Sequence, residues 1–340
     1  MDERTRLADA FLADAGWGGA RRQAIAGDAP NRRYIRLKSP ATGASAVLMD
    51  APPEAGEDVR PFVRITGYLR GIGLSAPAIL AADTERGFLL LEDLGDDLFA
   101  RLIPERPEME QTLYAAATDL LVMLHRQPPP DLANYDPPMM ARLAALALDW
   151  YAPGATGTRA SEADKAAFLA ETETVLEVVP PGGRVLVQRD YHAENLLWLP
   201  DRDGIARVGQ LDFQDAGAGH RAYDLMSLAE DARRDVDPAL AERLIAHYAR
   251  RTRLDPDSFR SAAATCAAQR NLRILGVFAR LSLHFGKPQY VDLIPRVWNL
   301  LQRDLEHPDL AGLRDLCALP EPTQANLQIL RDKCGTIPTL

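Results

Sequence analysis

The sequence predicts an α+β fold with two lobes, a small sheet-rich N-terminal lobe and a larger, mainly helical C-terminal lobe. Short apolar runs separated by Gly, Asp and Pro clusters occupy the N-terminal part, and such paired runs are typical of antiparallel hairpins. Beyond them, apolar residues recur at helical spacing, interrupted by one group of short strands. We therefore expect the N-terminal lobe at residues 1–94 and the C-terminal lobe at residues 95–340.

The N-terminal lobe is expected to begin with an amphipathic helix and to continue as hairpins. Its expected elements are a helix over residues 1–16, strands at Arg21–Ala26, Arg32–Lys38, Ala44–Met49 and Phe88–Leu91, and a helix at Glu57–Gly71. The Gly-Asp-Ala-Pro sequence of Gly27–Pro30 predicts the turn of the first hairpin. An acidic connector then leads into the second lobe.

The C-terminal lobe is expected to be helical apart from a small β element. Its expected elements are helices around Leu113–Leu124 and at Met139–Trp150, strands at Val185–Val187, Asn195–Leu199 and Ile205–Leu211, and successive helices from about Tyr223 onward. A Pro-rich connection at Gln127–Pro138 separates the first two helices. Ligand sites favour the interfaces that such lobes form.

Composition excludes several classes of function. The chain has 340 residues with a formal charge of −9 and a pI near 5.3, and this acidity argues against nucleic-acid or anionic-membrane partners. No apolar run is long enough for a bilayer span. Three scattered cysteines and an N-terminus without a signal-peptide pattern indicate reduced thiols and a cytoplasmic protein.

Three polar residues near the short strands, Asp190, Asn195 and Asp212, suit phosphoryl transfer. Transfer from ATP requires a carboxylate that orients the acceptor hydroxyl, and hard oxygen ligands that hold Mg²⁺ against the phosphates. Asp190 falls in a loop between two expected strands, and the next hairpin would bring Asn195 beside Asp212. Each residue alone is typical of a solvated loop, but their order and spacing together predict a site for ATP and Mg²⁺.

The segments Gln188–Asn195 and Leu211–Asp215 resemble the motifs of the aminoglycoside phosphotransferase and choline kinase-like family, with glutamine in place of the leading histidine. The resemblance extends over most of the chain and implies a protein-kinase-like two-lobed fold. It implies that Asp190 is the catalytic base and that Asn195 and Asp212 are metal ligands.

The same resemblance suggests roles for other segments. Gly27–Tyr34 is similar to the hairpin that covers the phosphates, and Leu89–Leu94 is similar to the adenine-binding hinge. Glu92 and Leu94 are therefore candidate nucleotide contacts. Asp224 is expected to accept backbone N–H groups of the catalytic loop, with a helix-start residue as the alternative.

Met49 stands where this family places the lysine that contacts the ATP phosphates. The phosphates still need a cation, and Arg32, Arg33 and Arg36 on the second strand are the nearest candidates. Period-two alternation places Arg32 and Arg36 on one face and Arg33 on the other, while a simply exposed strand edge is the alternative. Glu57 is expected to pair with such a cation or to complement the dipole of the next helix.

The acceptor site is predicted from a loop and a helix end. His192, Asp231 and Arg234 are candidate substrate contacts, against the alternatives of a hydrogen-bonded loop histidine and a solvated helix end. The strings Val47–Glu54 and Asp231–Val236 resemble the subgroup of anomeric amino-sugar kinases of bacterial cell-wall recycling. That subgroup lacks the same lysine and phosphorylates the C1 hydroxyl of N-acetylmuramate or N-acetylglucosamine, which implies a small sugar as substrate.

Two other classes of function compete with this interpretation. An antibiotic-modifying or choline-type kinase would bind a cationic acceptor and would need a strongly acidic pocket. A nucleotide-binding regulator without catalysis would have no need of Asp190, Asn195 and Asp212 together. A turnover assay with several acceptors separates these classes.

Overall fold

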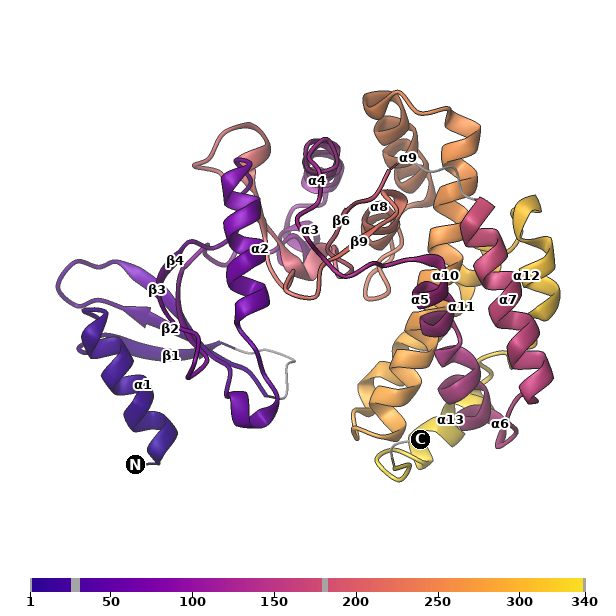
Figure 1. Cartoon of the computed structure of the whole chain (residues 1–340), viewed down its shortest axis with the longest axis horizontal. Helices are drawn as coiled ribbons and strands as arrows, with labels where there is room; N and C mark the ends of the chain where they lie inside the picture. The colour runs from indigo at the N-terminus through magenta and orange to yellow at the C-terminus, as the bar shows by residue number, and fades with distance from the viewer. Residues whose placement is uncertain (1, 26–30, 179–182, 339–340) are drawn as a thin grey trace. The chain divides into compact units, whose positions relative to one another are not determined.

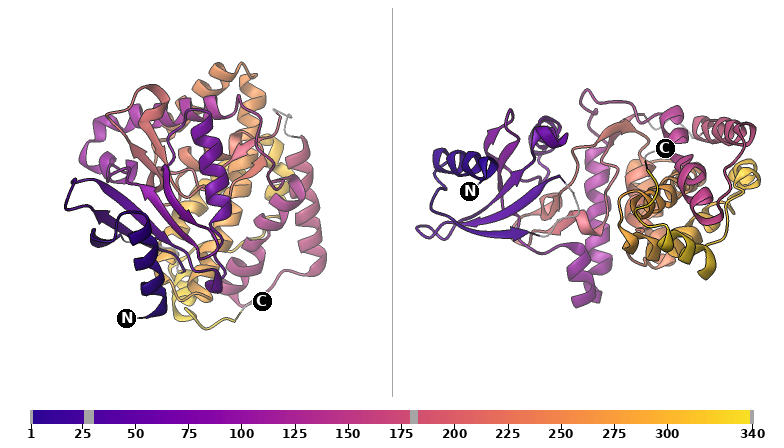
Figure 2. Two further views of the ribbon diagram at one scale, coloured as in Figure 1. Left: turned by 60° about the vertical axis from the view of Figure 1, so that its left-hand side comes forward. Right: turned by 90° about the horizontal axis from the view of Figure 1, so that it is seen from below.

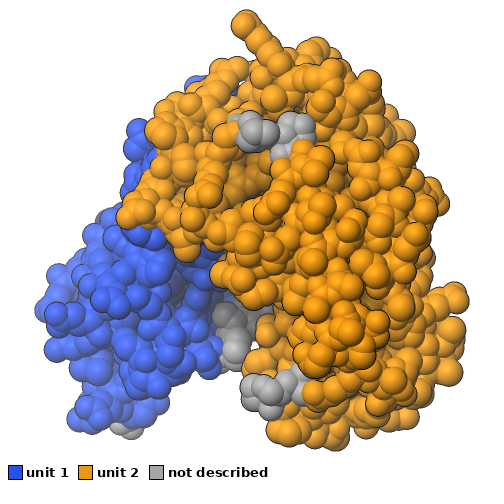
Figure 3. Space-filling model, turned by 45° about the vertical axis from the view of Figure 1, so that its right-hand side comes forward, with its two compact units in different colours: residues 1–120, 193–216 blue, residues 121–192, 217–340 orange. Residues whose placement is uncertain are grey.

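The computed structural model describes residues 2–25, 31–178 and 183–338. The chain divides into two compact units, coloured separately in Figure 3. Unit 1 comprises Met1–Leu120 and Ala193–Ala216, and unit 2 comprises Leu121–His192 and Gly217–Leu340. The division of the chain into lobes at residue 94 stays a prediction.

Unit 1 contains a five-stranded antiparallel sheet in the order β1-β2-β3-β5-β4 (Figure 1). The strands are β1 (Arg21–Ile25), β2 (Arg33–Lys38), β3 (Ser45–Asp50), β4 (Ile79–Asp83) and β5 (Phe88–Glu92). The four strands expected from the sequence are present, and the Gly27–Pro30 turn lies outside the described residues. Strand β4 was not predicted, because its Ile-Leu-Ala-Ala-Asp sequence lacks a clear alternation of apolar and polar residues.

The two faces of this sheet differ in character. Helix α1 (Glu3–Asp14) packs on one face of the sheet (Figure 2). Its Leu12 belongs to a buried cluster with Leu37, Leu48 and Phe88. Apolar side chains of this kind stabilise the fold by about 1.5–3 kcal/mol each when fully buried. The register pairs Tyr34 with Met49, and both side chains belong to the other face.

The other elements of unit 1 are short helices and a second hairpin. They are η1 (Pro53–Ala55), α2 (Arg60–Gly71), α3 (Phe99–Glu105), η2 (Pro107–Met109), α4 (Glu110–Leu124, which extends past the division), η4 (Ala193–Asn195), β7 (Leu196–Trp198), η5 (Gly204–Arg207) and β8 (Val208–Gln210). Helix α2 begins at Arg60 and not at the predicted Glu57, since Pro61 lies in its first turn and Glu57 pairs elsewhere. Strand β8 is also shorter than predicted, because Gly204–Arg207 forms a 3₁₀ turn.

Unit 2 is mainly helical. Its helices are α5 (Pro137–Ala144), the π-helical turn η3 (Ala147–Tyr151), α6 (Ala152–Thr156), α7 (Glu162–Val178), α8 (Ala222–Ala229), α9 (Pro238–Thr252), α10 (Pro256–Leu283), η6 (Pro288–Leu293), α11 (Ile294–Asp304), η7 (Pro308–Leu310), α12 (Ala311–Leu316) and α13 (Gln324–Asp332). The predicted helix Met139–Trp150 is therefore interrupted by a π-helical turn. None of the described helices is long and apolar enough to cross a bilayer.

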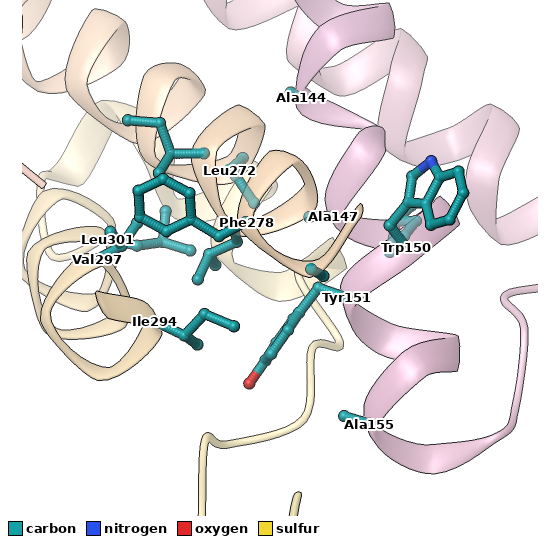
Figure 4. Packing of buried hydrophobic residues seen from close by; sticks show 14 of the residues in the cluster. Ala144, Ala147, Trp150, Tyr151, Ala155, Leu272, Phe278, Ile294, Val297 and Leu301 are labelled. Atoms are coloured by element: carbon teal, nitrogen blue, oxygen red, sulfur yellow. The ribbon is translucent and has the colours of Figure 1, made fainter. Parts of the chain in front are cut away.

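Helix α10 is the centre of this unit. Asp255 caps its first turn by accepting the Ser258 N–H at 2.9 Å. The helix packs against α5, α8, α11 and η3, and Figure 4 shows Leu272 and Phe278 of α10 close to side chains of α11. A helix buried on most sides is rigid, so its few polar side chains hold defined positions.

A two-stranded sheet in unit 2 leads into the predicted catalytic loop. Strand β6 (Val185–Val187) pairs with β9 (Gly217–Gly219), which the sequence did not predict because Gly-Ala-Gly has low strand propensity. A Cβ atom on Gly219 would lie 3.1 Å from the Cβ of Tyr135, and the Tyr135 N–H donates to the Ala218 carbonyl at 2.8 Å. The glycines therefore let Tyr135 approach this sheet.

A buried carboxyl pair lies between α8, α10 and α11. Asn271 donates to Glu230 at 2.9 Å and to Asp304 at 2.8 Å, and Arg303 donates to Glu230 at 2.7 Å. Burial and the charge of Glu230 raise the pKa of Asp304 well above its usual range. Folding therefore favours the protonated form of Asp304.

Replacing this acid tests the assignment. A carboxyl whose pKa is raised on folding stabilises the protein below its unfolded pKa, and that contribution is lost as the pH rises through the folded pKa. We expect Asp304→Asn, which mimics the protonated acid, to be at least as stable as the parent at pH 8 and to show a smaller loss between pH 5 and pH 8. Urea unfolding at both pH values measures this. Asp315→Asn, at an exposed position, is the control. If the free energy of unfolding changed equally with pH in the parent and in Asp304→Asn, the raised pKa of Asp304 would be contradicted.

Candidate active site

The predicted catalytic loop connects β6 of unit 2 to β7 of unit 1. Asp190 and His192 belong to unit 2, and Asn195 and Asp212 belong to unit 1. The loop begins in a left-handed conformation, since Arg189 has φ 75°, and it ends in the 3₁₀ turn Ala193–Asn195. A non-glycine residue in this region is uncommon and needs support from its surroundings.

Asp224 of α8 supplies this support. Its fully buried carboxylate accepts the Gln188 N–H at 2.6 Å and the Arg189 N–H at 2.9 Å. Burial raises the pKa of Asp224 to about 7, even though both backbone donors favour the ionised form. The role expected for Asp224 from the family resemblance therefore agrees with the hydrogen bonds of the described residues.

Positive charge surrounds Asp190. Its partial burial raises the pKa of the carboxyl group, but the charges of Arg273, Arg189 and Arg270 together hold that pKa below the usual value. His192 adds to this effect only when it is protonated, and its own pKa is lowered to about 4 by burial. Asp190 is therefore an ionised carboxylate at neutral pH.

The predicted substrate contacts occupy different environments within unit 2. Arg233 donates to Nε2 of His192 at 3.1 Å, and Asp231 accepts the Arg233 N–H at 2.9 Å. Asp231 and His192 are both buried, so the alternative of a solvated helix end is wrong for Asp231. Arg234 is half-buried and interacts with the surface pair of Asp235 and Arg296. Its role as a substrate contact stays a prediction.

The two predicted metal ligands lie at one end of the β7–β8 hairpin. The Leu211 N–H donates to the Asn195 carbonyl at 2.9 Å, so Asp212 follows directly after the residue that pairs with Asn195. Asp212 has φ 55° and accepts Nε2 of Gln214 at 2.8 Å. An amide oxygen and a carboxylate fit Mg²⁺, which binds one or two protein carboxylates together with phosphates and water.

Arg32 of unit 1 belongs to a group of polar residues that includes Asp212. Arg32 donates to Glu57 at 2.5 Å, and both side chains are largely buried. Burial raises the pKa of Tyr34, and the charges of Asp212 and Glu57 raise it further, while a hydrogen bond with Arg32 acts in the opposite direction. Arg32, Tyr34, Glu57 and Asp212 therefore form one cluster of interacting polar groups.

The other two arginines of the second strand serve different partners. Arg33 binds Asp50 at 2.7 Å, and Arg36 binds Asp93 and Asp96 at 2.8 Å. These pairs agree with the expectation that Arg32 and Arg36 share one face of the strand while Arg33 takes the other. Of the three, Arg32 is the one whose interactions lead to Asp212.

The predicted hinge residues have structural contacts. Glu92 accepts Arg202 at 2.6 Å and the Ala78 N–H at 3.1 Å, which ties the end of β5 to the β7–β8 turn. Leu94 packs close to Gly209, where an added Cβ would lie 3.2 Å from its side chain. Their role in nucleotide binding stays a prediction.

The sequence reasoning missed the residues that surround Asp190 from a distance along the chain. Tyr135 lies under the Arg189 guanidinium at 5.2 Å and donates to the Tyr223 hydroxyl at 3.1 Å. Arg273 is hydrogen-bonded to Tyr223, and Arg270 donates to the Glu230 carbonyl at 3.1 Å. Two arginines three positions apart in an alanine-rich, otherwise buried helix were the available signal.

Comparison with known proteins agrees with the motif. Residues 21–260 match the Phosphotransferase enzyme family. The chain is 40% identical to the N-acetylmuramate/N-acetylglucosamine kinase of Caulobacter vibrioides, an alignment that covers 92% of this chain and 95% of the relative. It is 33% identical to the enzyme of the same name from Pseudomonas putida, with 94% of each chain covered.

A solved structure confirms the fold class. The aminoglycoside phosphotransferase of Streptomyces rimosus, in complex with ADP and streptomycin, superposes with a TM-score of 0.53. The match covers 80% of this chain and 99% of that one at 17% identity. The predicted protein-kinase-like fold, with its antiparallel sheet and mainly helical remainder, is therefore confirmed.

Asp224→Asn tests the support of the loop. The amide keeps one acceptor oxygen but turns an N–H group toward one of the two backbone donors, which leaves that donor unsatisfied at a cost of about 1–3 kcal/mol. We expect a folded protein with a lower kcat and little change in KM for ATP. Steady-state kinetics and thermal unfolding measure both effects. Asp237→Asn, a conservative change at an exposed helix cap, is the control, and a parental kcat in Asp224→Asn would refute the positioning role.

Proposed function

This chain belongs to the phosphotransferase enzyme family, and we propose that it transfers the γ-phosphate of ATP to the C1 hydroxyl of N-acetylmuramate or N-acetylglucosamine. Two relatives that carry this function in their names align with nearly the whole chain. We also propose that this reaction takes part in the recycling of the bacterial cell wall. The three cysteines, which are free thiols, support a cytoplasmic location.

The positive charge around Asp190 is the observation that favours a sugar over a cationic acceptor. A kinase for aminoglycosides or choline binds a cationic acceptor and needs acidic neighbours for it. Here the groups that act electrostatically on Asp190 include Arg189, Arg270 and Arg273, and Arg233 lies beside His192. These arginines would repel a cationic acceptor, whereas a neutral or acidic sugar is compatible with their charge.

In the proposed reaction, Asp190 orients the C1 hydroxyl and takes its proton as the bond to the γ-phosphorus forms, while the bond from the γ-phosphorus to the β,γ-bridging oxygen breaks and ADP leaves. The C1 hydroxyl of a hemiacetal is more acidic than an ordinary alcohol, so an ionised carboxylate with a low pKa is a sufficient base. The lowered pKa of Asp190 keeps this group ionised at neutral pH. His192, which is neutral at that pH, and Asp231 are proposed to contact the sugar, as is Arg234.

The nucleotide is assigned to residues of unit 1. Asn195 and Asp212 would hold Mg²⁺, which neutralises charge on the β- and γ-phosphates. Arg32 is proposed as the cation that replaces the missing lysine, because it interacts with Tyr34, whose pKa the charge of Asp212 also raises. Arg33 is a weaker candidate, because its partner Asp50 lies outside the cluster of Arg32, Tyr34, Glu57 and Asp212. Glu92 and Leu94 are assigned to the adenine side.

The acceptor is tested by measuring ATP consumption with N-acetylmuramate, N-acetylglucosamine, kanamycin and choline. We expect turnover with the two amino sugars and a ³¹P NMR spectrum of a sugar 1-phosphate. Asp190→Asn is expected to fold normally and to lower kcat by about 10²–10⁴-fold, the usual contribution of a general base. A 6-phosphate product, or activity confined to kanamycin or choline, would assign the chain to another acceptor class, and no turnover at all would favour the non-catalytic regulator.

The phosphate cation is tested with single glutamine substitutions. Arg32→Gln is expected to raise KM for ATP by about 10- to 100-fold, which corresponds to the 1.5–3 kcal/mol of one charge-assisted hydrogen bond. Arg33→Gln and Arg36→Gln are the matched controls and should change this KM far less. The KM for the sugar, measured at saturating ATP, should stay close to the parental value. An increase confined to Arg33→Gln or Arg36→Gln would reassign the cation.

A further inference from the structure

Helix α10 carries three arginines along one stripe, Arg270, Arg273 and Arg280. Arg270 is buried and bound to the Glu230 carbonyl at 3.1 Å. Arg273 and Arg280 are partly accessible to solvent, as is Val277 between them, although most of the surrounding helix is buried. The stripe therefore presents Arg280, together with Arg273, which is already hydrogen-bonded to Tyr223, on a partly accessible face of a rigid helix.

Arg280 differs from its neighbours because it has no anion. Within residues 2–25, 31–178 and 183–338, its guanidinium makes no hydrogen bond or ion pair, and its Nε is enclosed by protein atoms. Burial lowers the pKa of Arg280, and the charge of Arg273 lowers it further. A partly buried cation without a counter-ion is less stable than a paired one, and like charges on one helix face are destabilising, so Arg280 suits an anionic ligand.

We propose that Arg280, together with Arg273, binds the carboxylate of N-acetylmuramate and sets the preference for this acidic sugar over N-acetylglucosamine. The inference rests on the proposed function. The two sugars differ by the lactyl ether at C3 of N-acetylmuramate, which bears the carboxylate. A guanidinium binds such a group through two parallel N–H···O bonds.

The order of groups along α10 fits this assignment. Arg273 acts electrostatically on Asp190, so the end of the stripe at Arg273 is close to the group assigned to the C1 hydroxyl. Arg280 lies about two helical turns farther, roughly 10 Å along the helix axis. A sugar whose C1 hydroxyl reaches Asp190 can therefore extend its C3 substituent along the stripe.

Arg280→Gln tests the inference through the ratio of two substrates. Because the side chain has no protein partner among the described residues, its replacement breaks no ion pair. We expect KM for N-acetylmuramate to rise about 10- to 100-fold, the loss of one charge-assisted contact. The KM for N-acetylglucosamine should change far less, and Arg280→Lys should keep part of the discrimination because it keeps the charge.

Arg260→Gln is the matched control, since Arg260 lies on the same helix but is exposed and paired with Glu242 and Asp257. Equal increases in KM for both sugars in Arg280→Gln, or no increase, would overturn the inference. If the parent phosphorylates neither sugar, the proposed function fails, and calorimetric titration with N-acetylmuramate then decides. Binding to the parent that Arg280→Gln weakens supports the carboxylate site, whereas equal binding or none overturns it.

Discussion

The buried carboxylate of Asp224 is the constraint on which the predicted catalytic loop depends. By accepting the N–H groups of Gln188 and Arg189, it allows Arg189 to occupy a left-handed conformation that a non-glycine residue seldom adopts. The loop then turns directly after β6, and the next side chain is that of Asp190. A carboxylate without these donors would be unfavourable in such a buried place, so the loop and α8 stabilise each other.

The arginines of α10 in unit 2 include two whose charged forms are disfavoured by their surroundings. Burial lowers the pKa of Arg270 and of Arg280, and the charge of Arg273 on the same helix lowers both further. Against this, the charges of Arg270 and Arg273 help to keep Asp190 ionised. Arrangements that destabilise the unliganded protein are common at functional sites, where a ligand restores the balance of charge.

The proposed replacement of the family's lysine by Arg32 would move a phosphate contact from one strand to the residue that precedes its neighbour. Met49 is buried on the face of the sheet that also carries its cross-strand partner Tyr34. Arg32, which directly precedes β2, interacts with the same Tyr34 and pairs with Glu57. Because cross-strand neighbours on one face are close, the neighbouring strand can supply the missing cation.

Local patterns in the sequence alone determined the sheet of the N-terminal part, the helical character of the remainder, and the order of Asp190, Asn195 and Asp212. These features depend on periodicity and on residues close together in the chain. Only the tertiary structure paired Arg32 with Glu57, buried Asp231, and brought Arg273 of α10 into the electrostatic environment of Asp190. Such assignments depend on long-range packing, since β9 and α10 are positioned by contacts with distant segments that leave no periodic signal in the sequence.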